Sequence, residues 1–107
     1  MAIVPELEIY STGPLTVLGF GGRTVLDHLR VADCRDWIVE LIKEHSVQSL
    51  AFDLTGVRYI PSGFLGLLAS IHKLGVEVLL FNACEDIREV LEITKLDQVL
   101  TVHEVDV

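Results

Sequence analysis

A serine at the start of a predicted helix is the residue best placed to do chemistry in this chain of 107 residues. Pro61 disfavours helix at Ile60, and an apolar helical pattern runs from Ser62 to about Lys73. A phosphate on Ser62 would meet unpaired backbone N–H groups and the positive end of the helix dipole. The same position also suits a serine that only caps the helix, and both interpretations stay open.

Other residue types that carry chemistry do not combine into a site. The histidines show no metal-ligand spacing with one another or with the cysteines (His28, His45, His72, His103, Cys34 and Cys84). The glycine-rich residues 19–22 lack a phosphate-loop pattern and predict a flexible loop. Ser62 lacks a nucleophile-elbow pattern and an evident histidine partner. We therefore predict no catalytic residue, no metal and no cofactor, and a protein that is not an enzyme.

Charge and composition narrow the classes of partner. The chain carries 8 basic and 16 acidic residues, a net charge of −8, which argues against nucleic acid and anionic membranes. A partner selected by charge would carry a basic face, although the acidity also serves solubility. No signal peptide and no apolar run of about 20 residues appears, so we expect a soluble cytoplasmic protein.

The N-terminal part predicts a hairpin followed by a helix. Apolar residues alternate with polar ones at Leu7 and Ile9 and again at Leu15 and Val17, with a turn at 12–14 between them. Residues 24–26 predict a short extended continuation. Asp33 is the expected N-cap of a helix, whose apolar face recurs at helical spacing (Cys34, Ile38, Leu41, Ile42 and His45).

The remaining residues alternate between strand and helix patterns. We expect strands at 49–54 and 76–81, the helix at 62–73 ended by Gly75, and a last strand at 100–102 reaching as far as 105. Asn82 with Glu85 predicts a capping box for a third helix, with an inner face of Ile87, Val90, Leu91 and Thr94. The sequence thus predicts one α/β domain over 1–107, a mixed sheet of about five strands with three helices packed against it.

Two blocks of sequence resemble the signature of STAS domains, the family of bacterial anti-sigma factor antagonists. Residues 52–68 read FDLTGVRYIPSGFLGLL, close to a strand ending in Asp-Leu-Ser/Thr-Gly-Val and followed by Asp-Ser-Ser/Gly-Gly-Leu-Gly. Residues 78–82 read VLLFN, and residues 87–97 read IREVLEITKLD, close to Val-Leu-Glu-x-Thr-Gly-Leu-Asp. Together the blocks cover the C-terminal half, and the N-terminal half matches in its order of elements.

The resemblance implies a regulatory mechanism and a STAS-type fold. Members bind an anti-sigma factor, often itself a serine kinase, and so free a sigma factor. Phosphorylation of a serine at the start of the second helix ends that binding, and the matching residue is Ser62. The chain keeps the pattern at Gly63 but departs from it at Pro61, where the family has Asp, and at Phe64 and Lys95, where the family has Gly.

The second helix and the loop before it are the expected docking face. The candidate partner-binding residues are Asp53, Thr55, Pro61, Ser62, Gly63, Phe64 and Leu67. Asp53 has an alternative role in capping turn N–H groups, and the apolar residues of the helix have alternative roles in packing or in a homodimer. The alternative function is a non-phosphorylated, stressosome-like scaffold subunit that acts through self-association.

Overall fold

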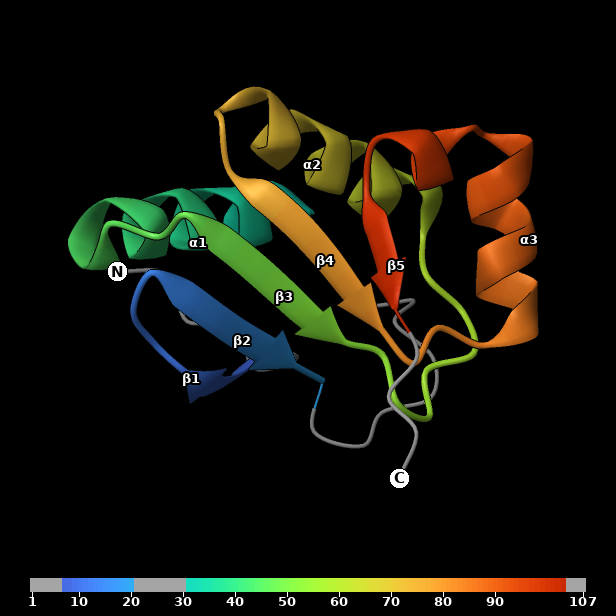
Figure 1. Cartoon of the computed structure of the whole chain (residues 1–107), viewed down its shortest axis with the longest axis horizontal. Helices are drawn as coiled ribbons and strands as arrows, with labels where there is room; N and C mark the ends of the chain where they lie inside the picture. The colour runs from blue at the N-terminus through green and yellow to red at the C-terminus, as the bar shows by residue number, and fades with distance from the viewer. Residues whose placement is uncertain (1–6, 21–30, 104–107) are drawn as a thin grey trace.

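The computed structural model describes residues 7–20 and 31–103, which form one sheet with helices packed against it (Figure 1). The strands are β1 (Glu8–Ser11), β2 (Leu15–Gly19), β3 (Ser49–Asp53), β4 (Glu77–Phe81) and β5 (Thr101–His103). They lie in the order β1-β2-β3-β4-β5, with β1 antiparallel to β2 and the other neighbours parallel. The predicted mixed five-stranded sheet is confirmed.

Helices connect the parallel strands. They are α1 (Val31–His45), α2 (Ser62–Lys73) and α3 (Glu85–Ile93), and a short 3₁₀ turn, η1 (Leu96–Gln98), precedes β5. Figure 1 shows α1 and α2 along one face of the sheet and α3 beside the β5 edge. This arrangement agrees with right-handed crossovers between successive neighbouring strands.

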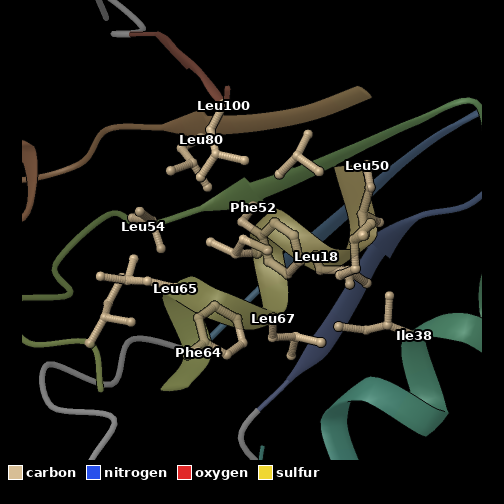
Figure 2. Close-up of a cluster of buried hydrophobic side chains, with 14 of the residues drawn as sticks. Leu18, Ile38, Leu50, Phe52, Leu54, Phe64, Leu65, Leu67, Leu80 and Leu100 are labelled. Atoms are coloured by element: carbon tan, nitrogen blue, oxygen red, sulfur yellow. The ribbon is translucent and has the colours of Figure 1, made fainter. Parts of the chain in front are cut away.

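The core lies between the sheet and α2. Parallel register places Leu18, Phe52 and Leu80 in one row across β2, β3 and β4, and all three side chains are fully buried. Figure 2 shows this row beside the buried side chains of α2. The ring of Phe64, in the first turn of α2, packs edge-on at 5.8 Å from Phe52 and 5.9 Å from Phe20, measured between centroids. These contacts fix the start of α2 against the centre of the sheet.

The hairpin forms as predicted, but its inward face is different. Thr16 and Leu18 are buried, whereas Leu15 is 51% exposed and Val17 is half-buried. The prediction that Leu15 and Val17 form the inward face of this strand is therefore wrong, because Thr16 and Leu18 form it. Both faces of β2 carry apolar residues, so the alternation alone does not show which face meets the helices.

Gly19 does not belong to a flexible loop, contrary to the prediction for residues 19–22. It is the last residue of β2, and the ring of Tyr10 lies where a Cβ would stand. A side chain at this position would force the Tyr10 ring, which is 51% exposed, to move away. Residues 21 and 22, and the predicted extension at 24–26, lie outside the described residues.

The helix boundaries were predicted well for α2 and less well for the others. Residues 62–73 are helical, and Gly75 has the expected left-handed φ of 88°. α1 begins at Val31, so Asp33 lies in its first turn and is not the predicted N-cap. The predicted capping box of α3 is also wrong, because Cys84 holds the N-cap position without a side-chain hydrogen bond.

Two predicted helix faces are narrower than expected. On α3, Ile87 and Leu91 are buried, but Val90 and Thr94 are exposed, and the Thr94 hydroxyl donates to the Val90 carbonyl at 2.8 Å. On α1, His45 is exposed. Each misassigned residue lies at the edge of the apolar stripe, where burial depends on the neighbouring element rather than on helical periodicity.

The described ranges, 7–20 and 31–103, contain neither a metal-ligand cluster nor a membrane-spanning helix. No group of three or more His, Cys, Asp or Glu side chains there is arranged to hold a metal ion. No helix in this part of the chain has the length and apolar character needed to cross a bilayer. Cys34 is buried and Cys84 is half-buried, and neither forms a disulfide.

Candidate functional site

Ser62 is the first residue of α2, and Pro61 explains why the helix starts there. Pro61 is extended, with φ −61° and ψ 145°, and holds the N-cap position. Its carbonyl accepts hydrogen bonds from the N–H groups of Phe64 at 3.0 Å and Leu65 at 3.4 Å. Ser62 is therefore one residue too late to cap the helix, and the interpretation of Ser62 as the N-cap is wrong.

The Ser62 hydroxyl is accessible. Its side chain is exposed, and within the described part of the chain it makes no hydrogen bond. The first turn of α2 holds no acidic residue, and Gly63 adds no side chain that would cover the hydroxyl. A group transferred to Ser62 Oγ would meet the positive end of the helix dipole and no acidic side chain from that turn.

A short hydrogen-bond chain holds the start of the loop that leads to Ser62. The carboxylate Oδ1 of Asp53 accepts from the Thr55 N–H at 3.0 Å and from the Thr55 hydroxyl at 2.5 Å. The Asn82 amide donates to Thr55 Oγ1 at 3.0 Å. Asp53 ends β3 and Asn82 follows β4, so the chain ties the loop to the carboxyl ends of two neighbouring strands. Asp53 thus has the turn-capping role that was the alternative.

The remaining candidate residues differ in how far they reach the surface. Thr55 and Gly63 are exposed, and Asp53 and Pro61 are half-buried. Phe64 and Leu67 lie in the core, with exposed fractions of 0% and 3%. Thr55, Pro61, Ser62 and Gly63 therefore contribute to the surface here, whereas Phe64 and Leu67 lie beneath it.

Sequence reasoning did not identify two features of this end of the molecule. Asn82 belongs to the loop anchor, and the signal was its position just after a strand parallel to the one that ends in Asp53. Tyr59 is half-exposed beside α3 and lines a hollow with Val90. The signal for Tyr59 was an aromatic residue in the loop between a strand and a helix.

The geometry defines a class of protein before any relative is considered. Among the described residues, the sheet end near Ser62 offers an exposed hydroxyl, an anchored loop and no metal-ligand cluster. The described residues thus define a small α/β domain with an exposed serine at the start of α2. The chain belongs to the STAS domain family, whose model matches residues 6–105.

Solved structures share the fold at low sequence identity. The anti-sigma factor antagonist SpoIIAA in its unphosphorylated form is 18% identical, covering 94% of this chain and 86% of that one, with a TM-score of 0.75. The phosphorylated form of the Bacillus cell fate determinant SpoIIAA is 17% identical over 94% and 91% of the two chains, with a TM-score of 0.67.

A third structure is an anti-sigma-factor antagonist (STAS) domain protein from Planctomyces limnophilus. It is 20% identical over 94% of this chain and 90% of that chain, with a TM-score of 0.76. No curated protein sequence matches this chain. At these identities the structural matches establish the fold, and the predicted STAS-type architecture is confirmed.

Proposed function

We propose that this protein is an anti-sigma factor antagonist that docks an anti-sigma factor with serine kinase activity and is released when Ser62 is phosphorylated. The observation that carries the proposal is the exposed Ser62 hydroxyl on the first residue of α2. Membership of the STAS family supports a regulatory binding role rather than catalysis. SpoIIAA, which shares the fold, exists in unphosphorylated and phosphorylated forms.

The switching step is a phosphoryl transfer to Ser62. The kinase partner binds ATP, the bond from the γ-phosphorus to the ADP oxygen breaks, and a bond from phosphorus to Ser62 Oγ forms. ADP leaves, and a carboxylate base of the kinase takes up the hydroxyl proton. The product carries about two negative charges at a place that was a neutral hydroxyl. If the partner covers Ser62, those charges must be desolvated, and docking weakens.

The docking face consists of the loop and the first turn of α2, with Thr55, Pro61, Ser62 and Gly63 at the surface. Phe64 and Leu67 keep that turn in place through the core. The hydrogen-bond chain from Asp53 to Asn82 limits movement of the loop. A partner then meets a preorganised surface and loses less entropy on binding.

Partner capture tests this function. Tagged wild type, Ser62→Asp and Ser70→Asp are used side by side as baits in lysate from the native organism, and the retained proteins are identified by mass spectrometry. Ser70 is the matched control because it is an exposed serine further along the same helix. We expect a kinase-like anti-sigma factor on wild type and Ser70→Asp but not on Ser62→Asp. Equal retention by all three baits would refute the switch at Ser62.

A scaffold function through self-association is the second candidate, and an apolar sheet face favours it. The row of Val17, Ala51 and Leu79 points away from the row of Leu18, Phe52 and Leu80 that meets α2. Leu15 on that face is 51% exposed, and Val17, Leu79 and Phe81 are half-buried. Mass measured by light scattering over a concentration series tests this candidate. A monomer at every concentration would reject it.

A further inference from the structure

An apolar groove lies between α3 and the loop that precedes α2. The buried side chains of Ile60, Leu65 and Ile87 form the floor of the groove. The exposed side chains of Tyr59 and Val90 form its sides, and its volume is about 250 Å³. Arg58 and Asp86 are the charged residues of its lining. Figure 1 shows the connection between β3 and α2 running alongside α3, which places these two segments next to each other. Leu65 is one helical turn after Ser62, so the groove adjoins the proposed docking face.

Large apolar side chains around the groove reach solvent. Tyr59 is 50% exposed, Val90 42% and Ile93 73%. Val90 and Ile93 are three residues apart on α3 and lie on the same side of the helix, with Asp86 one turn earlier. The exposed stripe of α3 therefore extends the groove by another turn. Contiguous exposed apolar surface of this kind is typical of a docking site.

The charge beside the groove selects the partner. α3 holds four acidic residues, Glu85, Asp86, Glu89 and Glu92, all of them exposed, against the single basic residue Arg88. Lys95 follows the helix, and Arg58 lies on the loop side of the groove. The α3 side is thus predominantly negative. A second copy of this chain, with its net charge of −8, is poorly matched to that side.

We propose that this groove docks an amphipathic helix of the protein partner, with apolar anchor residues over Tyr59, Val90 and Ile93 and lysine or arginine residues toward α3. The inference rests on the proposed function, because it assumes that this end of the molecule binds a protein. A helix fits the geometry, since its apolar residues recur along one side as the exposed residues of α3 do. The hollow accommodates an anchor side chain, and the acidic residues pair with the basic flank.

A peptide titration on the whole isotope-labelled protein tests the groove without knowledge of the natural partner. The probe is a synthetic peptide of roughly four helical turns, with leucine at positions i, i+3, i+4 and i+7 and lysine elsewhere. The control peptide replaces every lysine by glutamate. Amide shifts in two-dimensional NMR spectra report where each peptide binds and how tightly.

Ile93→Ser and Tyr59→Ser remove apolar surface at the groove, and Leu74→Ser is the matched control. Leu74 is 57% exposed and lies at the far end of α2, so its replacement also removes exposed apolar area without disturbing the core. We expect the lysine peptide to shift amides around Tyr59, Val90 and Ile93. Ile93→Ser should weaken this binding by about tenfold, and Leu74→Ser should leave it unchanged.

Several results would overturn the groove proposal. They are shifts that centre elsewhere, equal binding of the glutamate peptide, or equal weakening by Leu74→Ser. Shifts at the groove that grow with protein concentration before peptide is added would assign it to a second copy. Because the titration needs neither Ser62 nor a lysate, its failure leaves the capture experiment unaffected. Conversely, peptide binding together with failed capture would reject the anti-sigma function alone.

Discussion

The two ends of α2 lie on the same helix but are built differently. At the C-terminal end, the N–H groups of Leu74 and Gly75 donate to the carbonyls of Ile71 and His72, and His72 and Lys73 are the basic residues of the last turn. At the N-terminal end, Pro61 provides no side-chain cap and the first turn has no acidic residue. The C-terminal end is thus completed by its own residues, whereas the N-terminal end leaves the helix dipole uncompensated by its own side chains.

That difference is the reason for proposing that α2 binds at its N-terminal end. When the carbonyls at a helix end are capped and basic side chains lie nearby, a bound ligand adds little further stabilisation. A negative charge is stabilised at a helix end that has free N–H groups and an exposed hydroxyl. The predictions below test the comparison, beginning with the largest expected effect.

Phe64→Ala should destabilise the protein most. The ring is fully buried and packs on Phe20 and Phe52, so its loss leaves a cavity in the core and costs about 3–5 kcal/mol of unfolding free energy. Chemical denaturation measures the change. Leu74→Ala, at the exposed C-terminal end, should change stability by less than about 0.5 kcal/mol. Similar losses for the two variants would contradict the importance of the Phe64 contacts for the position of the first turn.

Asp53→Ala should loosen the loop that leads to Ser62. The substitution removes the acceptor of two hydrogen bonds from Thr55 and should cost about 1–2 kcal/mol of unfolding free energy. Amide hydrogen exchange should rise at Thr55 and Gly56 and stay unchanged at Leu74 and Gly75. Glu77→Ala is the control, since its carboxylate accepts one bond at 3.5 Å, from the Ser49 hydroxyl. Uniform exchange changes along the chain would mean that Asp53 supports the whole fold rather than this loop.

Replacing glycine by alanine should change the stability of the protein in opposite directions at two positions, one within α2 and one just beyond its C-terminal end. Gly75 has a left-handed φ of 88°, so Gly75→Ala should destabilise by about 1 kcal/mol. Gly66 is helical and exposed, and a Cβ there would meet open space, so Gly66→Ala should stabilise by about 0.5–1 kcal/mol. Thermal denaturation resolves the two effects. The same sign for both variants would contradict the assigned end of the helix.

Ser62→Asp should raise stability slightly, by about 0.3–1 kcal/mol at low salt, because a negative charge meets the positive end of α2. Denaturation at low and high ionic strength measures the gain, which salt should reduce. Ser70→Asp, placed later in the same exposed helix, should show no gain. A salt-independent gain, or an equal gain at Ser70, would rule out the dipole as its cause.

Much of the architecture was predictable because its signals are local. Pro61 and Gly75 mark the ends of α2, and an apolar run marks β3 as a buried strand. Helix caps were predicted less well, and the assignment of strand faces failed where several elements meet. The apolar pattern of β2 is compatible with either face of the sheet, so the burial of Thr16 and Leu18 in place of Leu15 and Val17 needed the tertiary structure.

By itself the sequence determined the order of elements and the place of Ser62 at the start of α2, since backbone restriction by proline and glycine acts within a few residues. Only the tertiary structure decided the role of Asn82 and the existence of the groove. Asn82 reaches Thr55 because the carboxyl ends of β3 and β4 lie side by side. Tyr59 and Val90 line the same groove because α3 follows β4 and lies beside the loop before α2. No local pattern encodes the proximity of segments so far apart in sequence.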